Sequence, residues 1–199
     1  MHPRNDACIP DRTVQRVNGT NTTVKGGMMA KIGLFYGSTT GSTLKVAEMI
    51  QEAFKPEAVD LIDVRKASPA DLSRYDVLIL GTSTWHWGGL QDEWANFEDK
   101  LTSDTLADKR VAFFGLGDQK RYPDHFADGM GLLYDRVKTA GARVVGMWSK
   151  SGYSYEASAA ELGGRLIGLA IDEDNESDKT HDRIQRWVKQ LKKELRQSI

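Results

Sequence analysis

Residues 31–54 read KIGLFYGSTTGSTLKVAEMIQEAF, and this stretch decides the fold class. It begins with an apolar run at 31–36, which is typical of a short buried strand. A loop rich in glycine and hydroxyl residues follows, and apolar residues then recur at helical spacing over 42–54. A strand, a loop and a helix in this order predict the first unit of an α/β fold.

The same alternation of strand and helix signals continues along the chain. Further strand segments are predicted at 59–64, 75–81, 110–115, 143–148 and 166–171. Helices are predicted at 90–101, 130–140 and 180–195, and an irregular segment at 149–165. This pattern predicts an open parallel sheet with helices on both faces, in which ligands bind beyond the carboxyl ends of the strands.

Composition limits the chemistry that the chain can perform. Its 199 residues include 40% hydrophobic residues and carry a net charge of −1, which is too apolar and too weakly charged for general disorder. No apolar run is long enough to span a membrane, and the balanced charge gives no reason to expect nucleic acid. The single cysteine, Cys8, excludes a disulfide framework and four-thiolate metal or iron–sulfur sites. Chemistry must therefore come from other side chains or from an organic cofactor.

Residues 1–28 differ from the remainder of the sequence. They show no periodicity and lack the apolar stretch of a signal peptide. We expect a disordered N-terminal extension with a net charge of +2, followed by one domain at 29–199 with a net charge of −3. A targeting or regulatory arm is the alternative for the extension. The absence of a secretory signal predicts a cytoplasmic protein.

The loop after the first strand has the composition of an anion site. Residues 37–43 read GSTTGST, so backbone N–H groups, hydroxyls and the positive end of a helix converge there. The loop has no Lys or Arg, so it is not the P-loop of an NTPase, and it lacks the dinucleotide fingerprint. Neutral donors suit a terminal monophosphate that is held and never transferred. A hydroxyl-rich helix cap without a ligand is the alternative.

Two further loops at the same predicted edge carry aromatic residues. Residues 81–89 read GTSTWHWGG, and their two tryptophans follow the predicted strand, where a flat ring system could stack on them. An apolar lid or a partner-binding patch is the alternative. Residues 115–122 read GLGDQKRY, in which glycines permit close approach of the backbone and Tyr122 adds an aromatic ring. The three loops together predict a mononucleotide with a planar heterocycle.

At about residues 30–196 the chain resembles the flavodoxins of the long-chain bacterial type. The motifs that carry the resemblance are KIGLFYGSTTGST at 31–43, DVLILGTSTW at 76–85, FGLGDQ at 114–119, LIGLAIDEDN at 166–175 and RIQRWV at 183–188. The irregular segment at 149–165 resembles the insertion that splits the fifth strand in that subfamily. The resemblance implies a flavodoxin-like sheet of five parallel strands in the order 2-1-3-4-5 and noncovalently bound FMN.

The resemblance also implies roles for individual residues. The implied cofactor-binding residues are Ser38, Thr39, Thr40, Gly41, Ser42, Thr43, Thr84, Trp85, His86, Trp87, Gly88, Leu116, Gly117, Asp118, Tyr122 and Asp174. Residues 38–43 would hold the phosphate, and 116–118 the pyrimidine edge. Trp85 would cover the inner face of the flavin and Tyr122 its outer face. A peptide flip in the loop at 86–88, permitted by its glycine, would present a backbone carbonyl to flavin N5.

Two positions depart from the family pattern. Ser83 stands where proline is usual, and Gly89 where glutamate is frequent, and both bear on the redox potential rather than on the cofactor. His86 invites a pH-switch interpretation, although an ordinary exposed loop histidine is the preferred one.

The implied function is a low-potential one-electron carrier, rather than an enzyme, that shuttles FMN between its semiquinone and hydroquinone. Expected partners are a reductase of the NADP-linked flavoprotein type and a low-potential electron acceptor, with no nucleic acid or membrane, and the chain is expected to be a monomer. Acidic residues around 92–108 and 172–178 could steer basic partners or be an ordinary solvated surface. The alternative function is an FMN-dependent NAD(P)H or quinone oxidoreductase on the same scaffold. A response regulator is excluded, because the required acidic residues are absent after the first and third strands.

Overall fold

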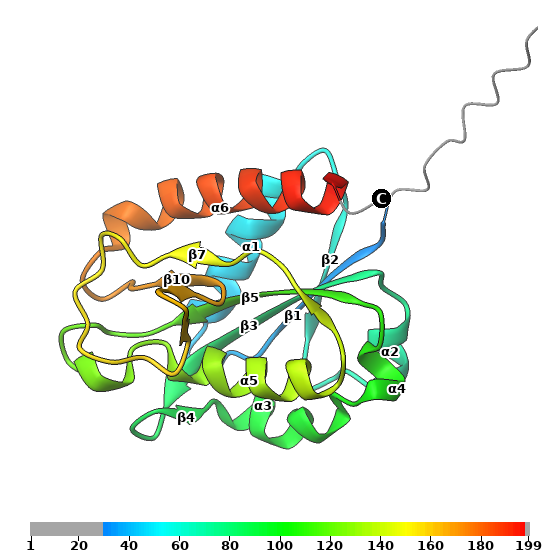
Figure 1. Cartoon of the computed structure of the whole chain (residues 1–199), viewed down its shortest axis with the longest axis horizontal. Coiled ribbons are helices and arrows are strands. Elements are labelled where there is room, and N and C mark those ends of the chain that lie inside the picture. Colours follow the sequence, from blue (N-terminus) through cyan, green and yellow to red (C-terminus); the bar gives the residue numbers. More distant parts are fainter. Residues whose placement is uncertain (1–29, 198–199) are drawn as a thin grey trace, which may run out of the picture.

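The computed structural model describes residues 30–197, so the predicted extension at 1–28, including Cys8, lies outside the described residues. A parallel sheet in the order β10-β5-β3-β1-β2 forms the centre of the fold (Figure 1). Its strands are β1 (Ile32–Tyr36), β2 (Val59–Asp63), β3 (Val77–Trp85), β5 (Arg110–Leu116) and β10 (Leu169–Ile171). The helices are α1 (Ser42–Phe54), α2 (Pro69–Ser73), α3 (Asp92–Phe97), α4 (Ser103–Leu106), α5 (Asp128–Thr139) and α6 (Ser177–Gln197), with 3-10 helices η1 (Glu98–Lys100) and η2 (Pro123–His125).

The outer strand beside β5 is split into two pieces. The first piece, β6 (Arg143–Val144), pairs in parallel with the beginning of β5, and β10 pairs in parallel with its end. Between them lies a small antiparallel sheet of β7 (Trp148–Ser149), β9 (Arg165–Leu166) and β8 (Glu161–Leu162). The structure therefore confirms the predicted order 2-1-3-4-5 and the fifth strand split by an insertion.

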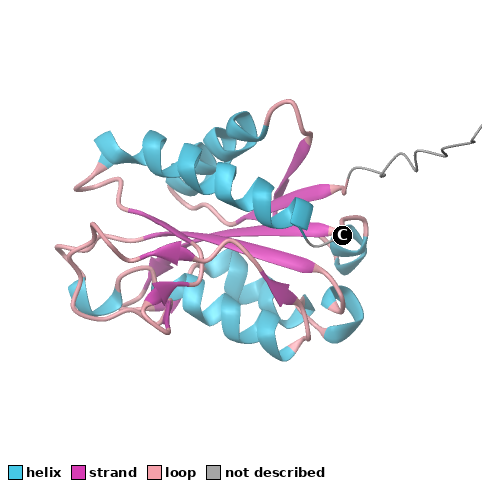
Figure 2. Ribbon diagram, turned by 45° about the horizontal axis from the view of Figure 1, so that its top comes forward, coloured by secondary structure: helices cyan, strands magenta, loops and turns pink. Residues whose placement is uncertain are grey.

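Helices cover both faces of the sheet. Figure 2 shows α1 and α6 packed together on one side, and α2, α3, α4 and α5 on the other. The middle strands read as unbroken apolar runs because both of their faces are covered, and 77–80 and 111–114 are fully buried. Each helix of the described segment is too short or too polar to cross a membrane.

Several predicted boundaries differ from the structure. The third strand extends to Trp85, four residues beyond its predicted end, because β4 (Gly89–Leu90) turns back and pairs with it. The predicted helix at 90–101 divides into α3 and η1, and α2 and α4 are too short for periodicity to reveal them. The predicted strand at 143–148 is interrupted at Gly146, whose φ of +76° breaks the extended backbone.

The core prediction concerns Ile50, whose side chain is fully buried in the cluster that joins α1 to the sheet. We expect Ile50→Ala to lower the free energy of unfolding by about 2–5 kcal/mol, because it removes buried methyl groups and leaves a cavity. Urea unfolding measures this change. Leu132→Ala on α5 is the matched control, since that side chain is 39% exposed and its loss should cost far less. Equal losses in the two variants would contradict the assigned core.

Candidate functional site

The loops that follow β1, β3 and β5 gather at one edge of the sheet. The strands are parallel, so their carboxyl ends meet there, on the left of Figure 1. A cavity of about 290 Å³ opens between two of these loops. It is lined by Thr84, Trp85, His86, Trp87, Gly88, Gly117, Asp118, Tyr122 and His125. Eight of these nine were predicted from the sequence, and the ninth, His125, was not.

The predicted phosphate loop adjoins this cavity without lining it. Ser38 Oγ accepts hydrogen bonds from the Gly41 N–H at 3.1 Å and the Leu44 N–H at 3.3 Å, so it caps α1. Gly41 has a φ of +93°, which glycine adopts without the cost that a side chain would impose. The N–H groups of Ser42 and Thr43 lie in the first helical turn, where no intrahelical acceptor exists. The loop thus contains a satisfied cap together with first-turn amides that have no acceptor within the helix.

Gln91 holds the phosphate loop, and sequence reasoning missed it. Its side chain is fully buried, and its Nε2 donates to Thr39 Oγ1 at 3.0 Å. Its Oε1 accepts from the Trp94 N–H at 3.3 Å and so caps α3. The only sequence signal was a polar residue directly before an acidic helix, which is typical of a cap and says nothing about a contact 52 positions away.

The turn after β3 has a strained backbone. His86, Trp87 and Gly88 have successive φ values of +48°, +56° and +99°. Positive φ is uncommon for residues with a side chain and a genuine outlier for a bulky one, and such a residue costs about 1–3 kcal/mol. Backbone strain of this kind is found at functional sites, where surrounding contacts hold it.

Contacts from separate segments hold the rings of this turn. Trp85 Nε1 donates to Ser83 Oγ at 2.8 Å, so the residue that replaces the family's usual proline orients the indole. Trp87 is 79% exposed and meets Tyr122 edge to face, with ring centroids 5.4 Å apart. His86 Nε2 lies 3.1 Å from Asp92 Oδ1, and both side chains are exposed. The aromatic rings therefore form the rim of the cavity.

A half-buried acid, Asp118, and a fully buried one, Asp172, shape the loop after β5. Burial raises the pKa of Asp118, but the Arg121 and Lys120 amides and Asn175 donate to its carboxylate, and the net pKa lies below its ordinary value. Asn175 Nδ2 donates to Asp118 Oδ1 at 2.8 Å and to both oxygens of Asp172 at 3.0 Å. Asp172 is fully buried, so Asn175 ties this loop to the end of β10.

Besides the six residues of the phosphate loop, two of the predicted residues lie apart from the cavity lining. Leu116 is the last residue of β5 and is 8% exposed, so its side chain belongs to the core. Asp174 is exposed in the turn after β10 and does not line the cavity. The members of that turn that reach the site are Asp172 and Asn175, which sequence reasoning did not single out. Their signal was present in the motif DEDN, but spacing alone does not show which of these side chains points inward.

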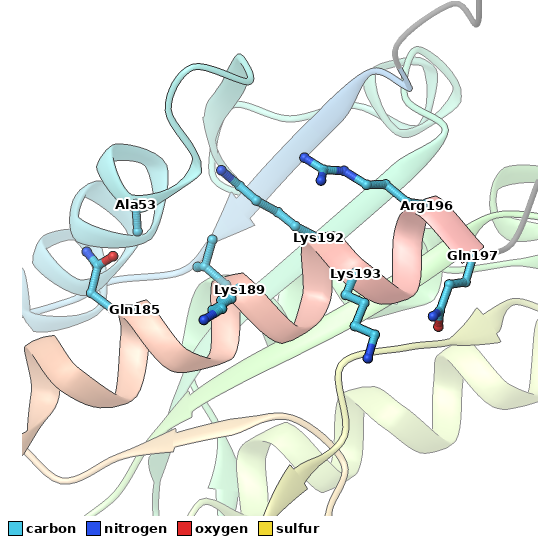
Figure 3. A pocket seen from close by; sticks show the side chains of 8 residues that line it. Ala53, Gln185, Lys189, Lys192, Lys193, Arg196 and Gln197 are labelled. Carbon is cyan, nitrogen blue, oxygen red and sulfur yellow. The ribbon is translucent and has the colours of Figure 1, made fainter.

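A larger hollow, of about 510 Å³, lies along α6 toward the opposite edge of the sheet and contains none of the predicted residues (Figure 3). Lysine and arginine side chains line it, but two of them serve the fold. Lys192 Nζ donates to the carbonyl of Phe54 at 2.7 Å and pairs with Glu57 at 2.6 Å, and Arg196 also pairs with Glu57. This hollow is the seam between α6 and the end of α1, so the smaller aromatic cavity is the stronger candidate.

Comparison with known proteins agrees with this geometry. The family model for flavodoxins matches residues 34–187. The flavodoxin of Synechococcus elongatus is 48% identical over 168 residues, which cover 84% of this chain and 99% of that protein. This chain belongs to the flavodoxin family. The resemblance to a long-chain bacterial flavodoxin that the motifs indicated is confirmed.

Further flavodoxins support the assignment. The Haemophilus influenzae flavodoxin is 42% identical over 168 residues, covering 84% of this chain and 97% of that protein. A crystal structure of Fusobacterium nucleatum flavodoxin bound to flavin mononucleotide has a TM-score of 0.79 and 34% identity, and the match covers 83% of this chain and 99% of that one. The predicted flavodoxin-like fold is confirmed. In residues 30–197 no group of three or more His, Cys, Asp or Glu side chains could hold a metal ion.

Glu176 provides a pH-dependent test of how the loops of the site are held. Burial raises its pKa, but hydrogen bonds from Lys179, Arg183 and Gln119 outweigh this effect and lower the pKa to about 2. The lowered pKa stabilises the fold above about pH 4.5, and this contribution disappears as pH falls toward 2. We expect Glu176→Gln to cost on the order of 2 kcal/mol near pH 7, and much less near pH 2, in urea unfolding.

Glu52→Gln is the control for this prediction, because the Glu52 side chain is 68% exposed and pairs with the exposed Lys55. Its effect on stability should be within about 0.5 kcal/mol at either pH. A Glu176→Gln variant that loses the same stability at both pH values would contradict the ion-pair origin of the effect.

Proposed function

We propose that this flavodoxin carries electrons one at a time on a noncovalently bound FMN, held where the three loops meet. Family membership and the FMN-bound structure of a relative support an FMN-based electron carrier. The single observation within this chain that carries the proposal is the cavity itself. It joins two exposed aromatic residues, a strained turn and glycine backbone at the edge where the phosphate loop also ends.

The residues present fit such a cofactor. The cavity walls combine aromatic rings, which suit a planar heterocycle, with backbone that can approach closely. A Cβ on Gly117 would lie 2.7 Å from the Ala127 backbone nitrogen, and one on Gly88 would lie 2.7 Å from His125 Nδ1. The hydroxyls and first-turn amides of 38–43 offer neutral donors to a phosphate. Nothing in this set requires a thiol or a metal.

Each part of the chain would contribute to holding and tuning the cofactor. FMN, when bound, supplies one-electron chemistry that no side chain can provide. Residues 38–43 anchor the phosphate, Trp85 and Tyr122 exclude water from the ring faces, and the backbone at 116–118 orients the pyrimidine edge. The carboxylate of Asp118 stays ionised, because its pKa is lowered, and so disfavours further negative charge nearby. The combination lowers the potential of the last reduction step.

The turn at 86–88 would respond to the redox state. Its glycine lowers the cost of a change in the orientation of the peptide between His86 and Trp87, because Gly88 adopts positive φ without strain. In one orientation a backbone carbonyl would point toward the cavity. That carbonyl would accept a hydrogen bond from the flavin ring only after the ring has gained a proton. The arrangement would therefore favour the transfer of one electron at a time.

The alternative function, an NAD(P)H or quinone oxidoreductase on the same scaffold, is not favoured. The matching relatives are named flavodoxins, over nearly their full lengths. Trp87 and Tyr122 also meet over the cavity rim, where an enzyme would need room for a second substrate.

The expected partners are other redox proteins. An NADP-linked flavoprotein reductase as donor and a low-potential acceptor suit a carrier of single electrons, and we propose that the chain acts as a monomer in the cytoplasm. Part of the acidic surface is available to steer such partners. Asp174 and Asp178 are exposed at the edge that holds the site, whereas Glu173 pairs with Lys45 and Asp172 is buried.

The cofactor and the one-electron chemistry are tested together by spectroscopy. We expect the purified protein, mixed with FMN, to show a bound-flavin spectrum and to accumulate a blue one-electron-reduced form during photoreduction. The physical reason is the turn at 86–88, which supplies an acceptor for the proton gained at that stage. Direct conversion from oxidised to fully reduced flavin would refute the carrier mechanism, and rapid NADPH oxidation with a quinone but no reductase would favour the enzyme.

Electrostatic steering is tested by the dependence of the reaction rate on salt. We expect electron transfer from a purified NADP-linked flavoprotein reductase to slow as ionic strength rises, with a weaker dependence in Asp174→Asn/Asp178→Asn. At low salt the double variant should react at least about twofold more slowly. Asp104→Asn is the control, because that acid is exposed on α4, away from the edge that holds the site. Rates independent of salt would exclude steering.

A further inference from the structure

His125 is the residue of the cavity lining for which the sequence indicated no role. It ends η2, three residues after Tyr122, and its side chain is 39% exposed. The ring lines the cavity, and its Nδ1 lies 2.9 Å from Asp128 Oδ2. The same nitrogen would lie 2.7 Å from a Cβ on Gly88, so the imidazole packs directly against the strained turn.

Asp128 holds this imidazole in one state. Its side chain is 11% exposed, and the residue begins α5, where the helix dipole favours a negative charge. Its second oxygen, Oδ1, accepts the Ala159 N–H at 2.6 Å. A buried carboxylate that already accepts from a backbone amide requires a donor on the histidine side, so Nδ1 carries a hydrogen. Nε2 is then the ring nitrogen that can accept a proton from solvent.

Positive charge within the cavity is confined to histidine. No Lys or Arg lines it, and the phosphate loop also lacks both residue types. Lys45, the first cation beyond that loop, pairs with Glu173 at 3.0 Å. The other ionisable groups of the lining are His86, Asp118 and Tyr122. Lys120 and Arg121 lie in the loop beside Tyr122, and Arg121 acts on Asp118 from outside the lining. Among the residues that line the cavity, only an imidazolium can therefore balance a negative charge that develops there.

The two histidines of the lining are not equivalent. His86 and its partner Asp92 are 65% and 72% exposed, so water and salt screen their interaction. The partner of His125 is buried, and screening there is weaker. The remaining charged groups near His125 are Asp124 on its own element and Glu156 on the segment hydrogen-bonded to Pro123, and both are exposed.

We propose that His125, oriented by Asp128, is the charge-compensating residue of the flavin cavity: its imidazole takes up a proton when bound FMN becomes fully reduced and anionic. The inference rests on the proposed function, since it requires FMN in this cavity. The electron arrives from the redox partner, and the proton passes from solvent to Nε2, while Nδ1 keeps its hydrogen bond. No bond between His125 and the cofactor forms or breaks.

The first test is the potential of the last one-electron step, measured from about pH 6 to about pH 9. In the wild type we expect this potential to fall as pH rises, because the imidazolium that stabilises the anion is lost. His125→Asn should flatten the profile, and at the acidic end should bind fully reduced FMN, relative to one-electron-reduced FMN, about tenfold more weakly, which lowers this potential by about 59 mV. His125→Lys should keep the potential high at the alkaline end, because its charge persists.

His181→Asn is the matched control, since His181 is exposed on α6 and does not line the cavity. Its profile should match that of the wild type. A second measurement needs no variant: NMR of the wild-type holoprotein near pH 7 should show the His125 ring signals moving toward the protonated form on full reduction. By linkage, protonation and binding of the reduced cofactor strengthen each other by the same factor.

The proposal is overturned if His125→Asn keeps the wild-type pH profile, since protonation of the flavin itself would then account for it. It is also overturned if the ring signals do not move on reduction. A chain that binds no FMN refutes the proposed function as well. A holoprotein that accepts single electrons while its profile is unchanged in His125→Asn refutes the role of His125 alone.

Discussion

The hydrogen bonding of β3 to two parallel neighbours is the constraint on which the rest of the structure depends. Gly81 pairs with Tyr36 on β1 and with Phe114 on β5, so all three strands end at the same edge. The Gly81 carbonyl accepts the Gly37 N–H at 3.1 Å and Trp94 Nε1 at 2.7 Å. One backbone group thereby joins the phosphate loop, the central strand and α3, and the pairing of β3 with β5 brings the third loop to the same edge.

The turn at 86–88, whose backbone is strained, lines the cavity. The turn at 86–88 keeps an unfavourable backbone because separate segments brace it: Asp92 on α3, Tyr122 on the loop after β5, and the pair of His125 and Asp128. The same braces bring an ionisable ring to the cavity, which links the geometry of the turn to the charge on the cofactor.

The sequence predicted most of the fold because its signals are local. Residues 42–54 form a helix at the predicted bounds, since an amphipathic period and a glycine cap act within one segment. The third strand was predicted too short, because its extension to Trp85 depends on pairing with residues in β4. Gln91, His125 and Asn175 were missed for a related reason, since their partners lie on other elements and short polar side chains carry no periodicity.

The sequence alone therefore determined the α/β class and the composition of three loops, because hydrophobic periodicity and loop chemistry are local properties, whereas the strand order followed from the resemblance to the flavodoxins. Only the tertiary structure decided which side chains face the cavity. Asp174 and Asp172 are two residues apart in one acidic run, yet one is exposed and the other fully buried, with Asn175 bridging it to Asp118. Packing of the turn after β10 against the loop after β5 sets that difference, and no spacing rule in a single chain contains it.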